Sequence, residues 1–227
     1  MSNNYYPYRD AIKNMMDNGW NVRDDLKHLS LEELQEHQKN ETLPYSVCAV
    51  NVLGDLNVGM MLRSAVVFGA EKFFIVGRRK FDRRSAVGAQ NYMDVVRVAA
   101  VDDHLVSNCN LEVDSQKVYD TVVEHGYVPI LFETGGRDFR EMNQIWDNLN
   151  SHSKKPCLIF GSESDGLPKP LVEMVDSDYI VSIPQWGVLR SLNVSAAASI
   201  AMYDAATKAG CYRKHETYDF PLPIKDN

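Results

Sequence analysis

The segment IPQWGVLRSLNVS, residues 183–195, decides the fold that we expect for this chain. It combines an apolar start, a glycine, hydroxyl and amide side chains, and the beginning of an alanine-rich apolar run. Packing alone requires only apolar residues at helix or strand spacing. A helix cap at Ser191 or Asn193 would explain one polar residue of the segment, but not its proline, its glycine and its other polar groups. The segment therefore predicts a loop, between a strand and a helix, that holds a ligand.

Short β-branched or aromatic runs alternate with helical patterns from residue 45 onward, which is typical of an α/β fold. The strands are nearly continuous in apolar character, so we expect a mostly parallel sheet with helices on both faces. The expected strands lie at residues 45–50, 72–76, 95–101, 128–133, 157–160 and 178–183. The expected helices lie at residues 58–68, 113–124, 139–149, 167–174 and 191–209.

Composition divides the 227 residues into three parts. Residues 1–44 are polar and acidic, and Ser30 followed by Glu33 predicts a capped helix, so we expect a helical extension here. Residues 45–211 form the expected α/β domain, and residues 212–227 form a tail that includes two prolines.

The composition, 44% apolar and 24% charged, is that of a soluble globular protein without a membrane helix. The first residues lack the basic start and apolar core of a secretion signal, so we expect a cytoplasmic protein. Cysteines lie about fifty residues apart, which predicts reduced and mostly buried thiols at Cys48, Cys109, Cys157 and Cys211. No histidines show metal-ligand spacing, so no metal site is expected.

The net charge of -7 argues against a protein that coats nucleic acid non-specifically, because phosphate binding depends on Lys and Arg. One short segment has the opposite character. It contains a single acid, Asp82, among the basic residues Arg78, Arg79, Lys80, Arg83 and Arg84. Such a cluster is either a solvated loop or a contact for phosphates, and its neighbours decide between these readings.

Two further loops follow predicted strands, at the edge of the sheet where ligands bind in open α/β folds. In the first, Asn57 and Gly59 precede Arg63, which lies about 120° from Asn57 around a helix. A helix cap and a surface ion pair would account for Asn57 and Arg63 without any function. The second, GSESDGLP at residues 161–168, has glycines that permit a tight turn or a close backbone approach to a ligand.

Taken together, three patterns resemble the motifs of the SpoU family of RNA 2′-O-methyltransferases. They are Asn57-x-Gly59-x-x-x-Arg63, Gly161-x-Glu163-x-x-Gly166-Leu167, and the segment at residues 183–195. The resemblance implies a SPOUT fold, an α/β sheet with a deep C-terminal trefoil knot formed by the second and third loops. It also implies S-adenosylmethionine as cofactor and a homodimer in which the catalytic arginine faces the partner's cofactor. Gln185 and Arg190 look most like the branch that methylates guanosines of tRNA.

The resemblance also implies roles for individual residues. Arg63 is the main catalytic residue, and Asn57, Glu163, Ser191 and Asn193 support it. The cofactor residues are Gly161, Ile183 and Leu192, with Phe132, Glu133 and Thr134 as another wall. We also expect the basic segment to contact the RNA backbone, because it follows the second strand on the same half of the domain as Arg63. Because guanidinium keeps its proton up to about pH 12, we expect Arg63 to clamp phosphate and stabilise charge rather than act as a base. The proton acceptor stays unassigned.

Three alternatives remain open at this point. The RNA is a ribosomal RNA instead of tRNA, the chain is a non-catalytic RNA-binding member of the same fold, or it is an α/β transferase for a small molecule. A transferase for a small molecule would not explain the basic segment.

Overall fold

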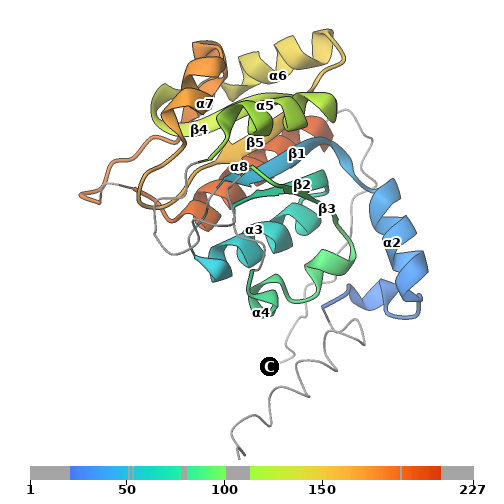
Figure 1. Ribbon diagram of the computed structural model, residues 1–227. Helices are drawn as coiled ribbons and strands as arrows, with labels where there is room; N and C mark the ends of the chain where they lie inside the picture. Colours follow the sequence, from blue (N-terminus) through green and yellow to red (C-terminus); the bar gives the residue numbers. More distant parts are fainter. Residues whose placement is uncertain are drawn as a thin grey trace, which may run out of the picture.

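The computed structural model describes residues 21–50, 52, 54–77, 81–100, 113–189 and 191–210. Its centre is a six-stranded parallel sheet of order β3-β2-β1-β5-β4-β6 (Figure 1). The prediction of six strands in a parallel sheet is confirmed. The strands are β1 (Leu43–Val50), β2 (Ala70–Val76), β3 (Asp94–Val98), β4 (Tyr127–Asp138), β5 (Lys155–Phe160) and β6 (Ile180–Ser182).

Helices connect these strands and cover both faces of the sheet. Alternate residues of β1 enter two separate cores: Val47 and Ala49 pack with α3, α6 and α8, whereas Cys48 and Val50 pack with α5 and α7. The described helices are α2 (Leu31–Asn40), α3 (Asp55–Val67), α4 (Arg83–Ala86), α5 (Ser115–Glu124), α6 (Met142–Ser151), α7 (Lys169–Met174) and α8 (Val194–Gly210). Short 3-10 helices are η1 (Asp24–Leu26), η2 (Ala89–Asn91), η4 (Phe139–Glu141) and η5 (Ser177–Tyr179).

Strand β4 departs most from its predicted bounds. It continues to Asp138, beyond the expected end at residue 133, because its register with β6 shifts. Both Phe132 and Arg137 pair with Val181, so the intervening residues of β4 bulge away from the partner strand. Helix α3 also begins earlier than expected, at Asp55 after the N-cap residue Gly54.

The predicted capped helix in the N-terminal part is confirmed as α2. The Ser30 hydroxyl accepts from the Glu33 amide, and the Glu33 carboxylate accepts from the Ser30 amide at 2.8 Å. Gln38 reaches the Val66 carbonyl at the end of α3, so this helix is anchored to the α/β domain. Residues 1–20 and the tail at residues 212–227 lie outside the described residues.

The predicted buried thiols are confirmed for Cys48 and Cys157, which lie on the neighbouring strands β1 and β5 and are both reduced. Cys109 and Cys211 lie outside the described residues. Among the helices that the structure describes, none has the length and apolar character needed to cross a membrane.

Candidate active site

A cavity of about 390 Å³ opens at the bulge of β4 and the carboxyl ends of β5 and β6, and reaches the start of α8. This volume lies in the range of small-molecule sites, roughly 300–1,000 Å³. The position is the edge of a parallel sheet where ligands bind. All six residues predicted to bind a cofactor line the cavity: Phe132, Glu133, Thr134, Gly161, Ile183 and Leu192.

The loop after β5 forms one wall of the cavity, and its glycines are required by close packing. Ser162 and Gly166 pair through their backbones, with N–O distances of 3.0 and 3.1 Å. A Cβ atom on Gly161 would overlap the backbone of Gly166 and lie 2.5 Å from the Leu167 nitrogen. Gly166 has a φ of +69°, which disfavours other residues. The predicted tight turn is therefore present.

Glu133 joins this loop to the bulge of β4. Its carboxylate accepts from the Leu167 amide at 2.9 Å and from the Thr134 amide at 2.8 Å. The bond from Leu167 fixes adjacent walls of the cavity relative to each other, and the bond from Thr134 orients the carboxylate within β4. A Cβ atom on Gly166 would lie 2.4 Å from this carboxylate, so a side chain there would displace Glu133 from its hydrogen bonds.

Three of the predicted catalytic residues meet beside the cavity. The Asn57 amide donates to the Glu163 carboxylate, and its carbonyl oxygen accepts from Asn193 Nδ2 at 3.2 Å. The Asn193 carbonyl oxygen accepts from Ser195 N at 2.9 Å, and thereby caps α8. The capping role considered for Asn193 is confirmed, whereas the one considered for Asn57 is wrong, because Asn57 lies inside the first turn of α3. Ser191 is exposed and also lines the cavity.

Arg63 lies apart from this group, exposed on α3 and outside the cavity lining. It forms no hydrogen bond or ion pair with any residue that the structure describes, so the surface ion pair considered for it is not observed. The exposed side chains of Leu56, Met60 and Val67 share its face of α3 at helical spacing. The adjacent helix α8 adds exposed Ile200 and Tyr203, and Tyr203 packs edge-on against Phe68. Arg63 therefore lies in an exposed apolar face formed by α3 and α8.

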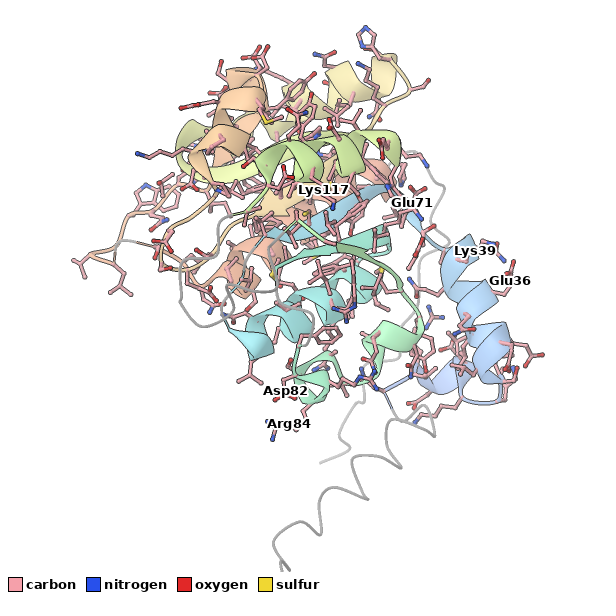
Figure 2. All side chains as sticks on the ribbon, in the orientation of Figure 1. Glu36, Lys39, Glu71, Asp82, Arg84 and Lys117 are labelled. Carbon is pink, nitrogen blue, oxygen red and sulfur yellow. The ribbon has the colours of Figure 1, made fainter. Side chains whose placement is uncertain are left out.

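The described part of the basic segment forms α4. Asp82 caps this helix by accepting from the Arg84 amide at 2.9 Å, and it forms an ion pair with the Arg84 guanidinium at 2.5 Å (Figure 2). The hydrogen bond from Arg84 lowers the pKa of Asp82 below its usual range. Arg83 is exposed, and Arg78, Arg79 and Lys80 lie outside the described residues.

Gly59 explains why α4 lies against α3. A Cβ atom at this position would lie 2.8 Å from the Asp82 carbonyl oxygen and overlap Ser85. Because position 59 has no side chain, α4 with Arg83 and Arg84 packs directly against α3, the helix that carries Asn57 and Arg63. The sequence pattern contains this glycine, but its partner could be identified only from the structure.

Several lining residues were not predicted individually, among them Ser182, Gln185, Val194 and Ala197. These four fall within the segment at residues 183–195 or within two residues of it. That segment was therefore the available signal, although it did not distinguish the side chains that face the cavity.

The fold and the cavity define an α/β protein with a small-molecule site between the ends of parallel strands. The model of the SpoU rRNA Methylase family matches residues 44–203, and the chain belongs to this family. The tRNA (guanosine(18)-2′-O)-methyltransferase of Escherichia coli K12 is 24% identical over 178 residues, which cover 76% of this chain and 68% of that protein.

Solved structures show the same fold at low identity. The TrmH/SpoU tRNA modifying enzyme of A. aeolicus aligns with a TM-score of 0.57 and 21% identity, covering 78% of this chain and 81% of that one. The SpoU methyltransferase AviRb of Streptomyces viridochromogenes, solved in complex with the cofactor AdoMet, aligns with a TM-score of 0.54 and 22% identity. That alignment covers 76% of this chain and 60% of AviRb, so the chain spans about three fifths of this relative.

Proposed function

We propose that this chain is an S-adenosylmethionine-dependent RNA 2′-O-methyltransferase that acts on tRNA. The observation that carries the proposal is the chain of hydrogen bonds from Glu163 through Asn57 to Asn193, which joins all three sequence motifs beside one cavity. Packing of the core does not require three polar side chains from distant segments to meet beside a surface cavity. The E. coli relative, named as a tRNA 2′-O-methyltransferase, supports the same activity.

The cavity residues fit S-adenosylmethionine chemically. Phe132 and Phe160 stack at a centroid distance of 4.7 Å and, with Leu192, supply apolar surface for an adenine ring. The carboxylates of Glu133 and Glu163 lie in the same lining and favour the positive charges of the cofactor. When bound, the cofactor supplies an electrophilic methyl group on a sulfonium.

Arg63 acts on the ribose and its neighbouring phosphate. Its guanidinium keeps its proton, so it can hold a phosphate bidentately and favour negative charge that develops on the 2′-oxygen. Asn57 and Asn193 hold the ends of α3 and α8 in place around the reacting group, and Glu163 fixes Asn57. Ser191 lies at the same mouth and can hydrogen bond to the ribose.

A homodimer completes the site in this proposal. Arg63 does not reach the cavity of its own chain, and apolar side chains surround it on the exposed face of α3 and α8. Exposed apolar surface of this kind favours an interface between copies. Pairing of this face with a second copy would carry Arg63 toward the cavity of the partner.

The trefoil knot and the domain bounds are further parts of the proposal. Membership of the SpoU family supports the knot, because the resemblance to this family implies one at the second and third loops. The family match from residue 44 supports a domain at residues 45–211 after a helical extension. We expect the protein to work in the cytoplasm, where tRNA is modified.

Transfer of a labelled methyl group to separate RNA fractions tests this function. Total tRNA, ribosomal RNA and a no-RNA control would be incubated with the protein and methyl-labelled S-adenosylmethionine. Label in tRNA supports the proposal, and label only in ribosomal RNA corrects the substrate. Cofactor binding by calorimetry without any transfer would instead favour a non-catalytic RNA-binding protein.

A further inference from the structure

The loop between β6 and α8 carries an unusual concentration of exposed apolar side chains. Trp186 is 85% exposed, and Val188 and Leu189 are exposed to a similar or greater degree. The loop projects outward from the body of the domain (Figure 1). Three large apolar side chains within four positions indicate a binding surface, because such groups are normally buried unless they meet a partner.

This exposed tip borders the cavity. Gln185 precedes Trp186 and lines the cavity, and Ser191 and Leu192 line it after the tip. Both ends of the loop therefore belong to the cavity wall, and Trp186 lies at its rim. A partner of Trp186 would stand next to whatever group enters the cavity.

The charge of the cavity lining limits which chemical group can bind beside Trp186. Among the described residues of its lining there are two carboxylates, Glu133 and Glu163, and no lysine or arginine. The two carboxylates repel negative charge, so this part of the lining disfavours phosphate. A nucleobase is uncharged and flat, and unpaired bases in RNA are commonly held by stacking on aromatic rings.

We propose that Trp186 is a stacking platform for the unpaired nucleobase of the nucleotide whose ribose enters the cavity. This inference rests on the proposed function and adds a residue that positions the substrate. Stacking tolerates every base, because each has a flat π face. Trp186 thus holds the nucleotide without selecting guanosine over the other bases, and that selection comes from other groups.

Two substitutions at one position separate stacking from apolar contact. Trp186→Phe keeps an aromatic face, whereas Trp186→Leu keeps apolar surface without one. Trp186→Leu should weaken binding of deacylated bulk tRNA by about 5- to 100-fold, while Trp186→Phe stays within a few fold of the wild type. S-adenosylmethionine affinity should be unchanged in both. Val123→Ser, a change at an exposed apolar residue of α5 outside this loop and the cavity lining, is the matched control and should bind tRNA normally.

Tryptophan fluorescence gives a readout that does not depend on methyl transfer. Subtracting the fluorescence spectrum of Trp186→Phe from that of the wild type gives the emission of Trp186. Binding of bulk tRNA should quench this emission. Binding of tRNA without quenching, or equal affinities for the Leu and Phe variants, would overturn the platform. A change of oligomeric state in Trp186→Leu would also overturn it, and would assign the loop to a protein interface. Failure of the proposed function is distinct, because it appears as absent methyl transfer by the wild type.

Discussion

Asn193 Nδ2 donates a hydrogen bond to Asn57 Oδ1 over 3.2 Å, although the two residues are 136 positions apart in the chain. Asn57 lies in the first turn of α3 and Asn193 caps α8, so this bond ties together the starts of the two helices that pack side by side. Glu163 holds the other side of Asn57. The three segments that resemble family motifs are therefore one hydrogen-bonded unit, and its members can be tested separately.

Asn193→Asp separates the cap from the link to Asn57. The aspartate still accepts from Ser195 N and caps α8, but it cannot donate to Asn57. We expect a melting temperature near that of the wild type and methyl transfer reduced by about tenfold, equivalent to one hydrogen bond of about 1.4 kcal/mol. Asn193→Ala loses both contacts and should also lose about 1 kcal/mol of stability. Unchanged transfer in Asn193→Asp would remove the link from the mechanism.

Arg63→Ala should lose at least about 100-fold in kcat, as expected when charge stabilisation of a transition state is removed. Its affinity for S-adenosylmethionine should match the wild type, because Arg63 does not line the cavity. Arg63→Lys retains the charge but not the planar fork, so it should recover only part of the rate. Calorimetry and single-turnover transfer measure the two properties. Normal turnover of Arg63→Ala would exclude Arg63 from catalysis.

Gly161→Ala should destabilise the fold and weaken cofactor binding, because the added methyl group overlaps the backbone of Gly166. The expected loss of unfolding free energy is about 1–3 kcal/mol. Gly187→Ala is a matched control in the neighbouring loop, since a Cβ there meets nothing within 4 Å among the described residues. Thermal melts and calorimetry compare the two variants. Equal effects of the two alanines would contradict the close packing inferred for Gly161.

Reversal of charge at Arg83 and Arg84 tests the proposed RNA contact of α4. The single variant Arg83→Glu is the cleaner one, because Arg84 already forms an ion pair with Asp82. Each lost phosphate contact should weaken RNA binding and reduce the slope of log affinity against log salt by about 1. Cofactor affinity serves as the control and should stay constant. An unchanged salt slope in the double variant would leave α4 without a role in RNA binding.

The buried thiols give a prediction about pH. Burial raises the pKa of Cys157 to about 12, whereas an unfolded cysteine has a pKa of about 8.5. The folded state therefore keeps the thiol protonated to a higher pH than the unfolded state does. This difference contributes fully to stability below about pH 8.5, and the contribution is lost as the pH rises toward 12. The free energy of unfolding of the wild type should fall as the pH rises above 8.5. In Cys157→Ala the fall, measured from the value of that variant at neutral pH, should be smaller. A flat profile in the wild type would contradict this.

Local patterns were sufficient for the fold class, because alternating strand and helix periods are visible within short windows. The motifs and their resemblance to the SpoU family pointed to six residues for a cofactor, and the structure places all six in the lining of one cavity. The bulge of β4 was not predictable, because it depends on the register with β6 rather than on the sequence of β4 alone. The partner of Gly59 and the contacts of Asn57 were hidden for the same reason, as each connects residues distant in the chain.

The position of the transferred methyl group tests the central claim most directly. A 2′-O-methyl group removes the hydroxyl that attacks the adjoining phosphodiester in alkali. After incubation of the wild type with labelled S-adenosylmethionine and tRNA, alkaline digestion should leave the label in a resistant dinucleotide. Label in ordinary mononucleotides would mean methylation of a base, and absence of label would mean that this tRNA is not methylated by the protein; either result would contradict the claim.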